Sequence, residues 1–190
     1  MLFFTPKHSA FSRNTALNAN IVQTLASLEG PGQVWGADGI AAGMGEADLK
    51  GYDNFELFSA RLASTGVAKT LEGAGPFTVF AATDTAIQTY ETLNGPITAD
   101  VLNYCIVPGT VAASAVSKGG LKTLQGEEIT YSRKFRKDFV DDAILGEKTF
   151  GGFSDFPVDV ACDNGLIHSV GILTVPGYAA VGGGVGQKQL

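Results

Sequence analysis

Hydrophobic positions recur mostly at helical spacing in the first part of the chain and alternate with polar positions in its last third. Near the start, the residues at helical spacing are Ile21, Val22, Leu25 and Leu28. Asn20 directly precedes them and is a residue type that caps helix N-termini. The pattern predicts one short amphipathic helix in an otherwise glycine-punctuated leading segment.

Between residues 51 and 117 the pattern predicts short helices around a buried strand. Phe55, Phe58 and Leu62 follow a D-x-x-E start at Asp53 and lie on one helix face. The run 75–84 is rich in β-forming residues and is bounded by turn residues. The other elements expected here are a short turn over 67–71, helices capped by Asp84 and Thr98, a strand at 106–107 and a short helix over 111–117.

The last third of the chain predicts extended structure. The side chains that share one face of this segment are Leu121, Thr123, Ile129, Tyr131, Phe135 and Phe139. Two final strands are expected over 158–161 and 166–175. Helices first and strands mostly later indicate an α+β fold with an antiparallel sheet.

Composition narrows the classes of partner. The 190 residues are 45% hydrophobic and 17% charged, which is typical of a chain with a packed core. The net charge of −6 argues against nucleic acid, since phosphate binding needs a concentrated basic surface. The charge-free stretch 164–187 is long enough to span a membrane, but it contains His168, Pro176 and several glycines. We interpret it as a buried strand followed by a tail and expect no transmembrane segment.

Residues 1–28 contain Lys7, His8 and Arg13 and no acidic residue. An acid-poor, hydroxyl-rich, weakly basic leader is typical of an organelle transit peptide. A solvated arm has the same composition, so both interpretations stay open.

No constellation of residues predicts catalysis. His168 and Ser169 are adjacent, so on a strand they point to opposite faces, and a buried, hydrogen-bonded histidine is the expected role. The two histidines of the chain lie on distant segments and cannot form a metal site together. Asp141 and Asp142 are interpreted as a solvated turn, and the glycine-rich run 182–188 as a flexible tail. We therefore expect no catalytic residue, no metal and no cofactor.

The two cysteines, Cys105 and Cys162, leave three interpretations open. They are small buried hydrophobic residues, which is the usual case, or one disulfide, or attachment points for a chromophore.

Two segments with characteristic spacing resemble the two sequence boxes of the fasciclin-type (FAS1) domain. They are GPFTVFAATDTAI at 75–87 and NGLIHSVGILTVP at 164–176, with YCIVPG at 104–109 and TLQG at 123–126 between them. The resemblance covers about residues 54–176 and implies an α+β wedge of short helices packed on an antiparallel, β-sandwich-like sheet. It also implies a binding and adhesion module rather than an enzyme.

Four positions depart from the pattern of that family. Ala82 replaces the usual Pro and Ile87 the frequent Phe, changes that a core absorbs with modest repacking. Cys105 replaces the usual His, and Gly171 the usual acidic residue. The resemblance associates these last two positions with integrin-type recognition, so their loss indicates that the adhesion surface is not retained.

The chain is thus expected to comprise an N-terminal extended arm (1–49) with one short amphipathic helix, a FAS1-like domain (50–177) and a glycine-rich tail (178–190). Aromatic and basic residues are typical of interface centres. The basic run near residue 135 suits an acidic protein, or forms a solvated edge that discourages pairing between sheets. The residues predicted to contact a partner are Phe3, Phe4, Phe11, Arg13, Ile21, Leu25 and Trp35 in the arm, and Arg133, Lys134, Arg136 and Lys137 in the domain.

These features favour a non-enzymatic scaffold or linker subunit that docks into a larger protein assembly. By analogy with fasciclin-like domains in algal antenna linkers, the specific hypothesis is a phycobilisome rod linker with acidic antenna proteins as partners, in a plastid and associated with thylakoids. The alternatives are an extracellular adhesion or matrix protein and a carrier of a carotenoid or another small apolar ligand.

Overall fold

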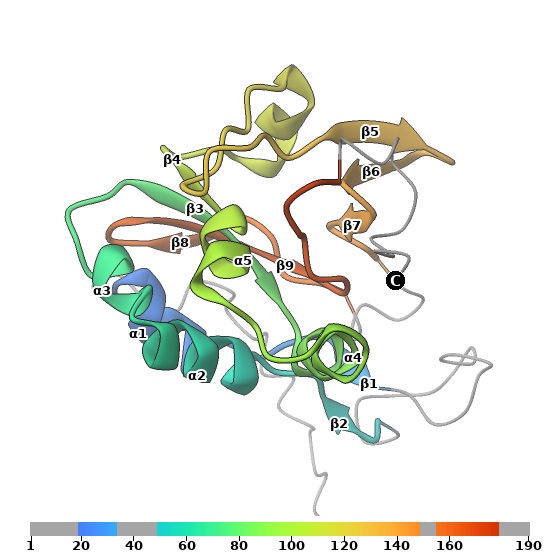
Figure 1. Cartoon of the computed structure of the whole chain (residues 1–190). Coiled ribbons are helices and arrows are strands. Elements are labelled where there is room, and N and C mark those ends of the chain that lie inside the picture. Colours follow the sequence, from blue (N-terminus) through green and yellow to red (C-terminus); the bar gives the residue numbers. More distant parts are fainter. Residues whose placement is uncertain (1–18, 34–48, 149–154, 179–190) are drawn as a thin grey trace, which may run out of the picture.

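The computed structural model describes residues 19–33, 49–148 and 155–178 of the chain (Figure 1). The helices are α1 (Ile21–Leu25), α2 (Glu56–Thr65), α3 (Ala68–Leu71), α4 (Asp84–Asn94), α5 (Ala99–Tyr104) and the 3-10 helix η2 (Ala113–Lys118). The strands are β1 (Gly32–Gln33), β2 (Gly51–Tyr52), β3 (Phe77–Ala82), β4 (Ile106–Pro108), β5 (Tyr131–Lys134), β6 (Lys137–Val140), β7 (Ala143–Leu145), β8 (Val160–Cys162) and β9 (Gly165–Val170).

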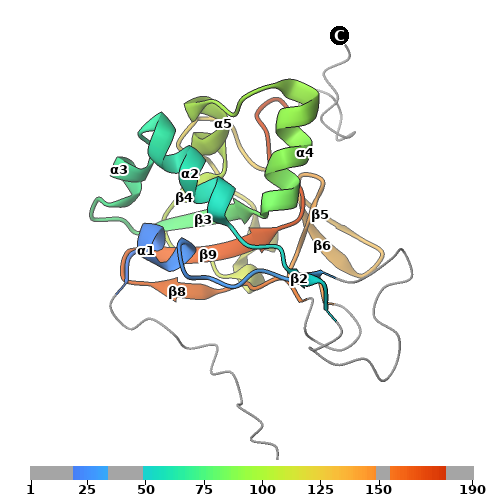
Figure 2. The ribbon, with the colours of Figure 1, turned by 90° about the horizontal axis from the view of Figure 1, so that it is seen from below.

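A four-stranded sheet in the order β4-β3-β9-β8 forms the centre of the molecule. Figure 2 shows α2, α4 and α5 on one side of this sheet. Its central strands, β3 and β9, are parallel and pair from Phe77 opposite Gly165 to Ala82 opposite Val170. The expected α+β class is confirmed, but the sheet is mixed rather than antiparallel. The long crossover between β3 and β9, which a parallel pair requires, contains α4, α5 and the strands β5 to β7.

Two smaller sheets flank the central one. Strands β1 and β2 form an antiparallel pair. Strands β5, β6 and β7 form a three-stranded antiparallel sheet that projects from the side of the molecule (Figure 1).

The core lies between the helices and the central sheet. Its largest fully buried side chains are Tyr104, Phe55, Phe58, Phe80, Ile21, Leu25, Leu62, Leu71, Ile87, Leu102, Ile106 and Leu121. The helical spacing predicted for the segment after residue 53 is confirmed by the burial of Phe58 and Leu62 on one face of α2.

Helix α1 belongs to this core. Asn20 caps it as predicted, because its side chain accepts a hydrogen bond from Gln23 N at 2.9 Å while the Gln23 side chain accepts from Asn20 N. The side-chain oxygen of buried Asn164, directly before β9, accepts from Ile21 N at 2.9 Å. The same Asn164 amide donates to Leu71 O at the end of α3. A single buried side chain therefore ties α1 and α3 to the central sheet.

The aspartate near the N-terminus of each of the helices α2 and α4 caps the other helix. The Asp84 carboxylate accepts from Leu57 N at 2.7 Å, in the first turn of α2. The Asp53 carboxylate accepts from Thr85 N at 2.9 Å, in the first turn of α4. The prediction that each aspartate caps the helix following it is wrong, because the two helix N-termini lie close enough for each carboxylate to serve the other helix.

Candidate functional site

The β5–β6 hairpin ends in a two-residue turn made of Phe135 and Arg136. Lys134 pairs with Lys137 as the last step of the ladder. Phe135 has φ 52° and Arg136 has φ 64°. Two positive φ angles match the twist of a hairpin and are the signature of a type I′ turn. The alternation after residue 121 predicted one extended face through this region, and that prediction is wrong because the chain reverses here.

The turn residues are unusual for their conformation. Type I′ turns favour Asn and Gly, since a Cβ atom costs about 1–2 kcal/mol per residue in the left-handed region. Phe135 is also 92% exposed, the most exposed of the large hydrophobic residues in the described segments. An exposed aromatic side chain in a strained conformation stabilises neither the turn nor the core. Such a residue is a candidate for binding.

Four basic residues lie on either side of Phe135 in the hairpin. Two of them, Arg133 and Lys137, form ion pairs with carboxylates. Arg133 lies 2.7 Å from the Asp138 carboxylate, which also accepts from Tyr131, and hydrogen bonds from these two side chains lower the pKa of Asp138. Lys137 lies 2.9 Å from Glu147.

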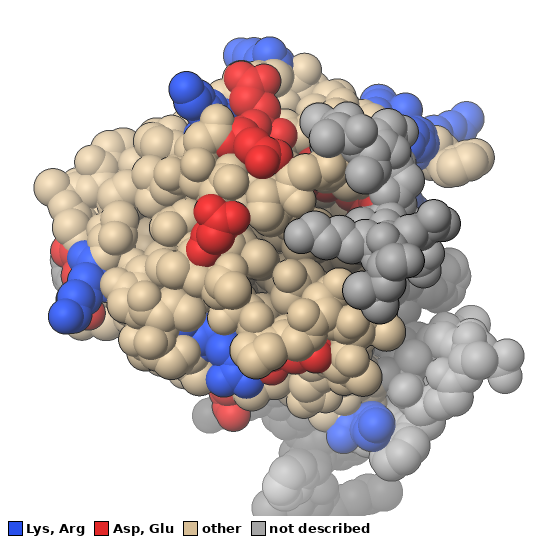
Figure 3. Space-filling view, viewed as in Figure 1, with Lys and Arg blue, Asp and Glu red and all other residues tan. Residues whose placement is uncertain are grey.

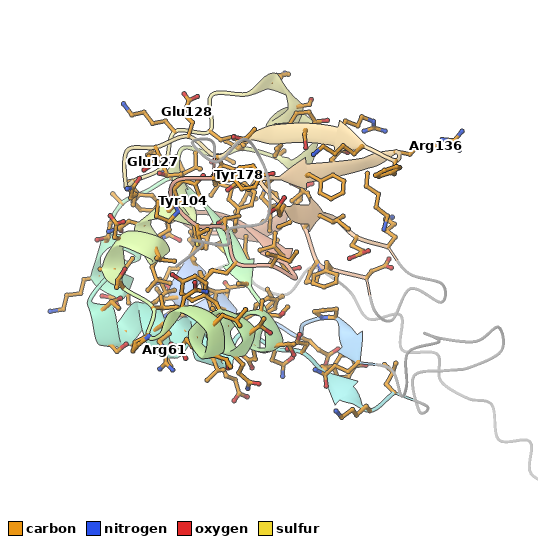
Figure 4. The ribbon with its side chains drawn as sticks, turned by 45° about the vertical axis from the view of Figure 1, so that its right-hand side comes forward. Arg61, Tyr104, Glu127, Glu128, Arg136 and Tyr178 are labelled. Atoms are coloured by element: carbon orange, nitrogen blue, oxygen red, sulfur yellow. The ribbon has the colours of Figure 1, made fainter. Side chains whose placement is uncertain are left out.

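The two residues that flank Phe135, Lys134 and Arg136, have no ion-pair partner in the described part of the chain. Figure 3 shows Lys and Arg side chains gathered at this edge, and Figure 4 shows Arg136 pointing away from the body of the molecule. We call Lys134, Phe135 and Arg136 the hairpin tip.

The structure divides the predicted contact residues. The four basic residues of the run lie together at the end of the hairpin, though around a turn rather than along one strand. Ile21 and Leu25 lie in the core of the chain itself, and their predicted contact with a partner is wrong because the domain buries both side chains. The remaining predicted contacts lie outside the described residues: Phe3, Phe4, Phe11, Arg13 and Trp35.

Asp141 and Asp142 form the predicted turn, between β6 and β7, but the turn is not solvated as the sequence indicated. Asp141 is buried, accepts from Thr130 N at 2.8 Å and from the Tyr104 hydroxyl at 3.0 Å, and burial raises its pKa to about 6. Asp142 accepts from the Tyr178 hydroxyl at 2.9 Å, and burial raises the pKa of Tyr178 to about 12. The missed signal is the pair of tyrosines, whose hydroxyls need acceptors once their rings are buried.

The histidine prediction is confirmed, and of the three interpretations of the cysteines the structure excludes the disulfide. His168 is buried, its Nδ1 accepts from Asp159 N and its Nε2 lies 2.8 Å from Val111 O. Burial lowers its pKa, so the ring is neutral.

Cys105 is a buried free thiol that accepts from the Thr174 hydroxyl at 3.4 Å, and burial raises its pKa to about 12. Cys162 is also free.

Where the FAS1 pattern has an acidic residue, the aromatic ring of Phe156 occupies the space beside Gly171. A Cβ atom added at Gly171 would lie 3.1 Å from that ring. The described segments contain no cluster of three potential metal ligands and no helix with the length and apolar character of a membrane span.

Comparison with known proteins agrees with this architecture. The fasciclin domain family matches residues 53–176. Protein sll1483 of Synechocystis sp. (strain ATCC 27184 / PCC 6803 / Kazusa) is 30% identical over 135 residues, which cover 66% of this chain and 69% of that protein.

A solved FAS1 domain pair from the insect cell adhesion molecule Fasciclin I matches with a TM-score of 0.51 and 12% identity. That match covers 84% of this chain and 52% of the solved chain, so this protein spans about half of its length. At this identity the likeness shows the fold alone. Fasciclin domains are interaction and adhesion modules and are generally not enzymes. By its sequence match over most of the folded region and by its fold, the chain belongs to the fasciclin domain family.

Proposed function

We propose that this protein is a non-catalytic docking subunit of a larger protein assembly and that its hairpin tip contacts an acidic partner. The observation that carries the proposal is Phe135, exposed at the end of a projecting hairpin between two cations that form no ion pair with a described residue. The fold around it supplies rigidity, because β6 pairs with both β5 and β7.

The chemistry of the tip fits a protein interface. An aromatic side chain next to arginine is the usual composition of an interface centre, where a few residues supply most of the binding energy. Lys134 and Arg136 form no ion pair within the described segments, so binding to an acidic surface breaks no ion pair there and gives both charges a partner. The protein as a whole carries a net charge of −6, which makes the tip a local exception and orients an acidic partner toward it.

In its specific form the proposal makes the assembly a photosynthetic antenna, with this chain as a phycobilisome linker in a plastid, associated with thylakoids. Two sequence features support it: the acid-free composition of residues 1–28 and the aromatic residues Phe3, Phe4, Phe11 and Trp35 near the N-terminus. The arm and the hairpin tip would then be two separate contacts of one subunit.

The test places a photo-crosslinking amino acid at position 135 of the full chain in its native cell. We expect a discrete adduct with an acidic protein, and we expect the double variant K134E/R136E to lose it. The matched control is K69E/K122E, which changes the net charge equally at exposed lysines on other elements. It should keep the adduct.

Three results would contradict the proposal: no adduct at position 135, an adduct that both double variants lose equally, or a chain that is monomeric in its native setting. An adduct with an antenna protein supports the specific form. Recovery of the chain in a secreted fraction, crosslinked to a matrix or cell-surface protein, supports the extracellular alternative instead.

A further inference from the structure

A cavity of about 240 Å³ opens between α4 and the chain that follows β9. Its walls are mostly apolar, and two of the three most exposed large hydrophobic residues in the described segments lie on it. These are Leu93 at the end of α4, 76% exposed, and Ile172 after β9, 52% exposed. The third, Phe135, belongs to the hairpin tip. Exposed apolar side chains that converge on a single hollow mark a binding site rather than a random surface feature.

The polar groups that line this cavity include oxygen atoms that accept no hydrogen bond from a described residue. The half-buried Tyr90 hydroxyl makes no hydrogen bond to any described residue. Asp142 uses one carboxylate oxygen for the Tyr178 hydroxyl, and no described residue donates to its second oxygen. Asp141, buried beside it, also lines the cavity. Tyr178, labelled in Figure 4, is buried and lines the cavity, and Tyr104, also labelled there, is buried and donates to Asp141.

No lysine or arginine is among the described residues that line the cavity, so none of these residues neutralises the two aspartates. A carboxylate at the edge of an apolar hollow repels anions and attracts cations, and the low polarity of the walls strengthens that preference. The rings of Tyr90 and Tyr178 add faces that attract an organic cation.

We propose that this cavity binds a small amphipathic amine, whose apolar body lies against Leu93 and Ile172 and whose ammonium group faces Asp142. An apolar cavity of about 150 Å³ holds a single benzene ring, so the cavity described here accommodates a body of about one to two rings. This site is separate from the hairpin tip, and the two proposals stand or fall independently.

The test uses three probes with the same apolar body: naphthylmethylamine, naphthylmethanol and naphthoate. Titration calorimetry on the full chain at neutral pH should rank them amine, alcohol, carboxylate, with the amine about tenfold tighter than the alcohol. Asp142→Asn keeps an oxygen for Tyr178 and should reduce amine affinity to that of the alcohol. Asp163→Asn, at the exposed β8–β9 turn, is the matched control and should leave the ranking unchanged.

A second variant tests the apolar wall. Ile172→Ser changes an exposed side chain and should weaken the amine and the alcohol about fivefold each. Thermal melting of each variant checks that the fold is retained. The proposal is overturned if the three probes bind equally, if none binds at millimolar concentration, or if Asp142→Asn has no effect. The other possible occupant is a second copy of the chain, which sedimentation detects as a dimer. A dimer that buries Leu93 and Ile172 and excludes the probes also overturns the proposal.

Discussion

At the scale of single residues, the buried carboxylate of Asp141 links stability to pH. Its pKa is raised from 3.8 to about 6 by burial. Between these values the folded chain binds more protons than the unfolded chain, so the Asp141 contribution to the free energy of unfolding falls as pH rises from about 4 to 6. Asp141→Asn removes this titration.

Urea denaturation of the native protein and of Asp141→Asn, at intervals from pH 4 to 7, measures the effect. The stability of the native protein relative to the variant should decrease up to about pH 6 and then level off. His168, whose pKa is lowered, is present in both proteins and cancels in the difference. A difference that is constant with pH would show that Asp141 is not shifted upward.

The Tyr104 hydroxyl is the second residue-scale test. It donates to Asp141 at 3.0 Å, within reach also of Glu128 O at 3.2 Å. Tyr104→Phe leaves a buried carboxylate without one of its donors, and we expect a loss of about 1–3 kcal/mol in the free energy of unfolding. Tyr131→Phe is the control, because its hydroxyl also donates to a carboxylate, that of Asp138, but at a more exposed place. Equal losses in the two variants would contradict a special role of burial.

These residues show what a sequence can and cannot predict at this scale. The buried, hydrogen-bonded state of His168 was predictable, because a histidine inside an apolar strand must find hydrogen-bond partners, although the sequence did not identify Val111, 57 positions away, as one of them. The burial of Asp141 was not, since the tyrosine that donates to it lies 37 positions away in the sequence. No local pattern distinguishes such a carboxylate from one in a solvated turn.

At the scale of elements, the exchanged aspartate caps couple α2 to α4. Asp84→Ala removes the acceptor of Leu57 N and also a favourable charge in the first turn of α4. We expect it to cost about 1–2 kcal/mol, and Asp53→Ala, which removes only the bond from Thr85 N, to cost less.

The double variant reports the coupling between the two helices. Because the caps lie at one junction, the cost of losing both should be smaller than the sum of the single losses. Chemical denaturation of the three variants measures it. Strict additivity would mean that each cap stabilises its helix alone.

At the hairpin tip, the residues that would stabilise the turn differ from those that the proposed function needs. Replacing Phe135 and Arg136 by Asn and Gly supplies the residues that a type I′ turn favours, and we expect the free energy of unfolding to rise by about 1–2 kcal/mol. The same change removes the aromatic side chain and one of the unpaired cations. Under the proposed function, crosslinking to the partner from a neighbouring position should be lost.

A stabilised variant that still binds its partner would show that the tip is not the contact. A variant that is not stabilised would show that the turn carries no strain. Thermal unfolding and crosslinking from position 134 separate these two outcomes.

Most helices and strands could be predicted from the local sequence pattern, but the pairing of the strands could not. The helices capped by Asn20 and Thr98 and the strand in 75–84 are found where the spacing predicts them. The parallel pairing of β3 with β9 depends on the path of the long connection between them, which alternation cannot encode. The reversal at Phe135 escaped prediction for a different reason: its residues lack the Asn-Gly signal of a tight turn.

At the scale of the whole molecule, the first described segment is part of the domain rather than an appendage. Ile21 and Leu25 are buried in the core, and strand β1 pairs with β2. The segment packs so closely at Gly30 that only glycine fits, because a Cβ atom there would lie 1.8 Å from the carbonyl oxygen of Asp53. Ile21 and Leu25 are therefore unavailable for the partner contact predicted for the leading residues.

That geometry makes two truncations differ sharply. Removing residues 1–18 leaves every described core side chain in place, so the free energy of unfolding should be unchanged. Removing residues 1–33 deletes the Ile21 and Leu25 side chains and leaves the Asn164 side-chain oxygen without its donor. Since each large buried aliphatic side chain is worth about 2–5 kcal/mol, that truncated chain should unfold or lose most of its stability.

Denaturation midpoints together with incorporation into the native assembly decide between the contacts of the proposed function. If the shorter truncation folds normally but no longer assembles, the arm is an essential contact alongside the hairpin tip. If it folds and assembles as the full chain does, residues 1–18 are not needed for assembly and the predicted contacts of Phe3, Phe4, Phe11 and Arg13 are wrong. A shorter truncation that fails to fold would contradict the division of the chain at residue 19, because the core described here would then depend on residues before it.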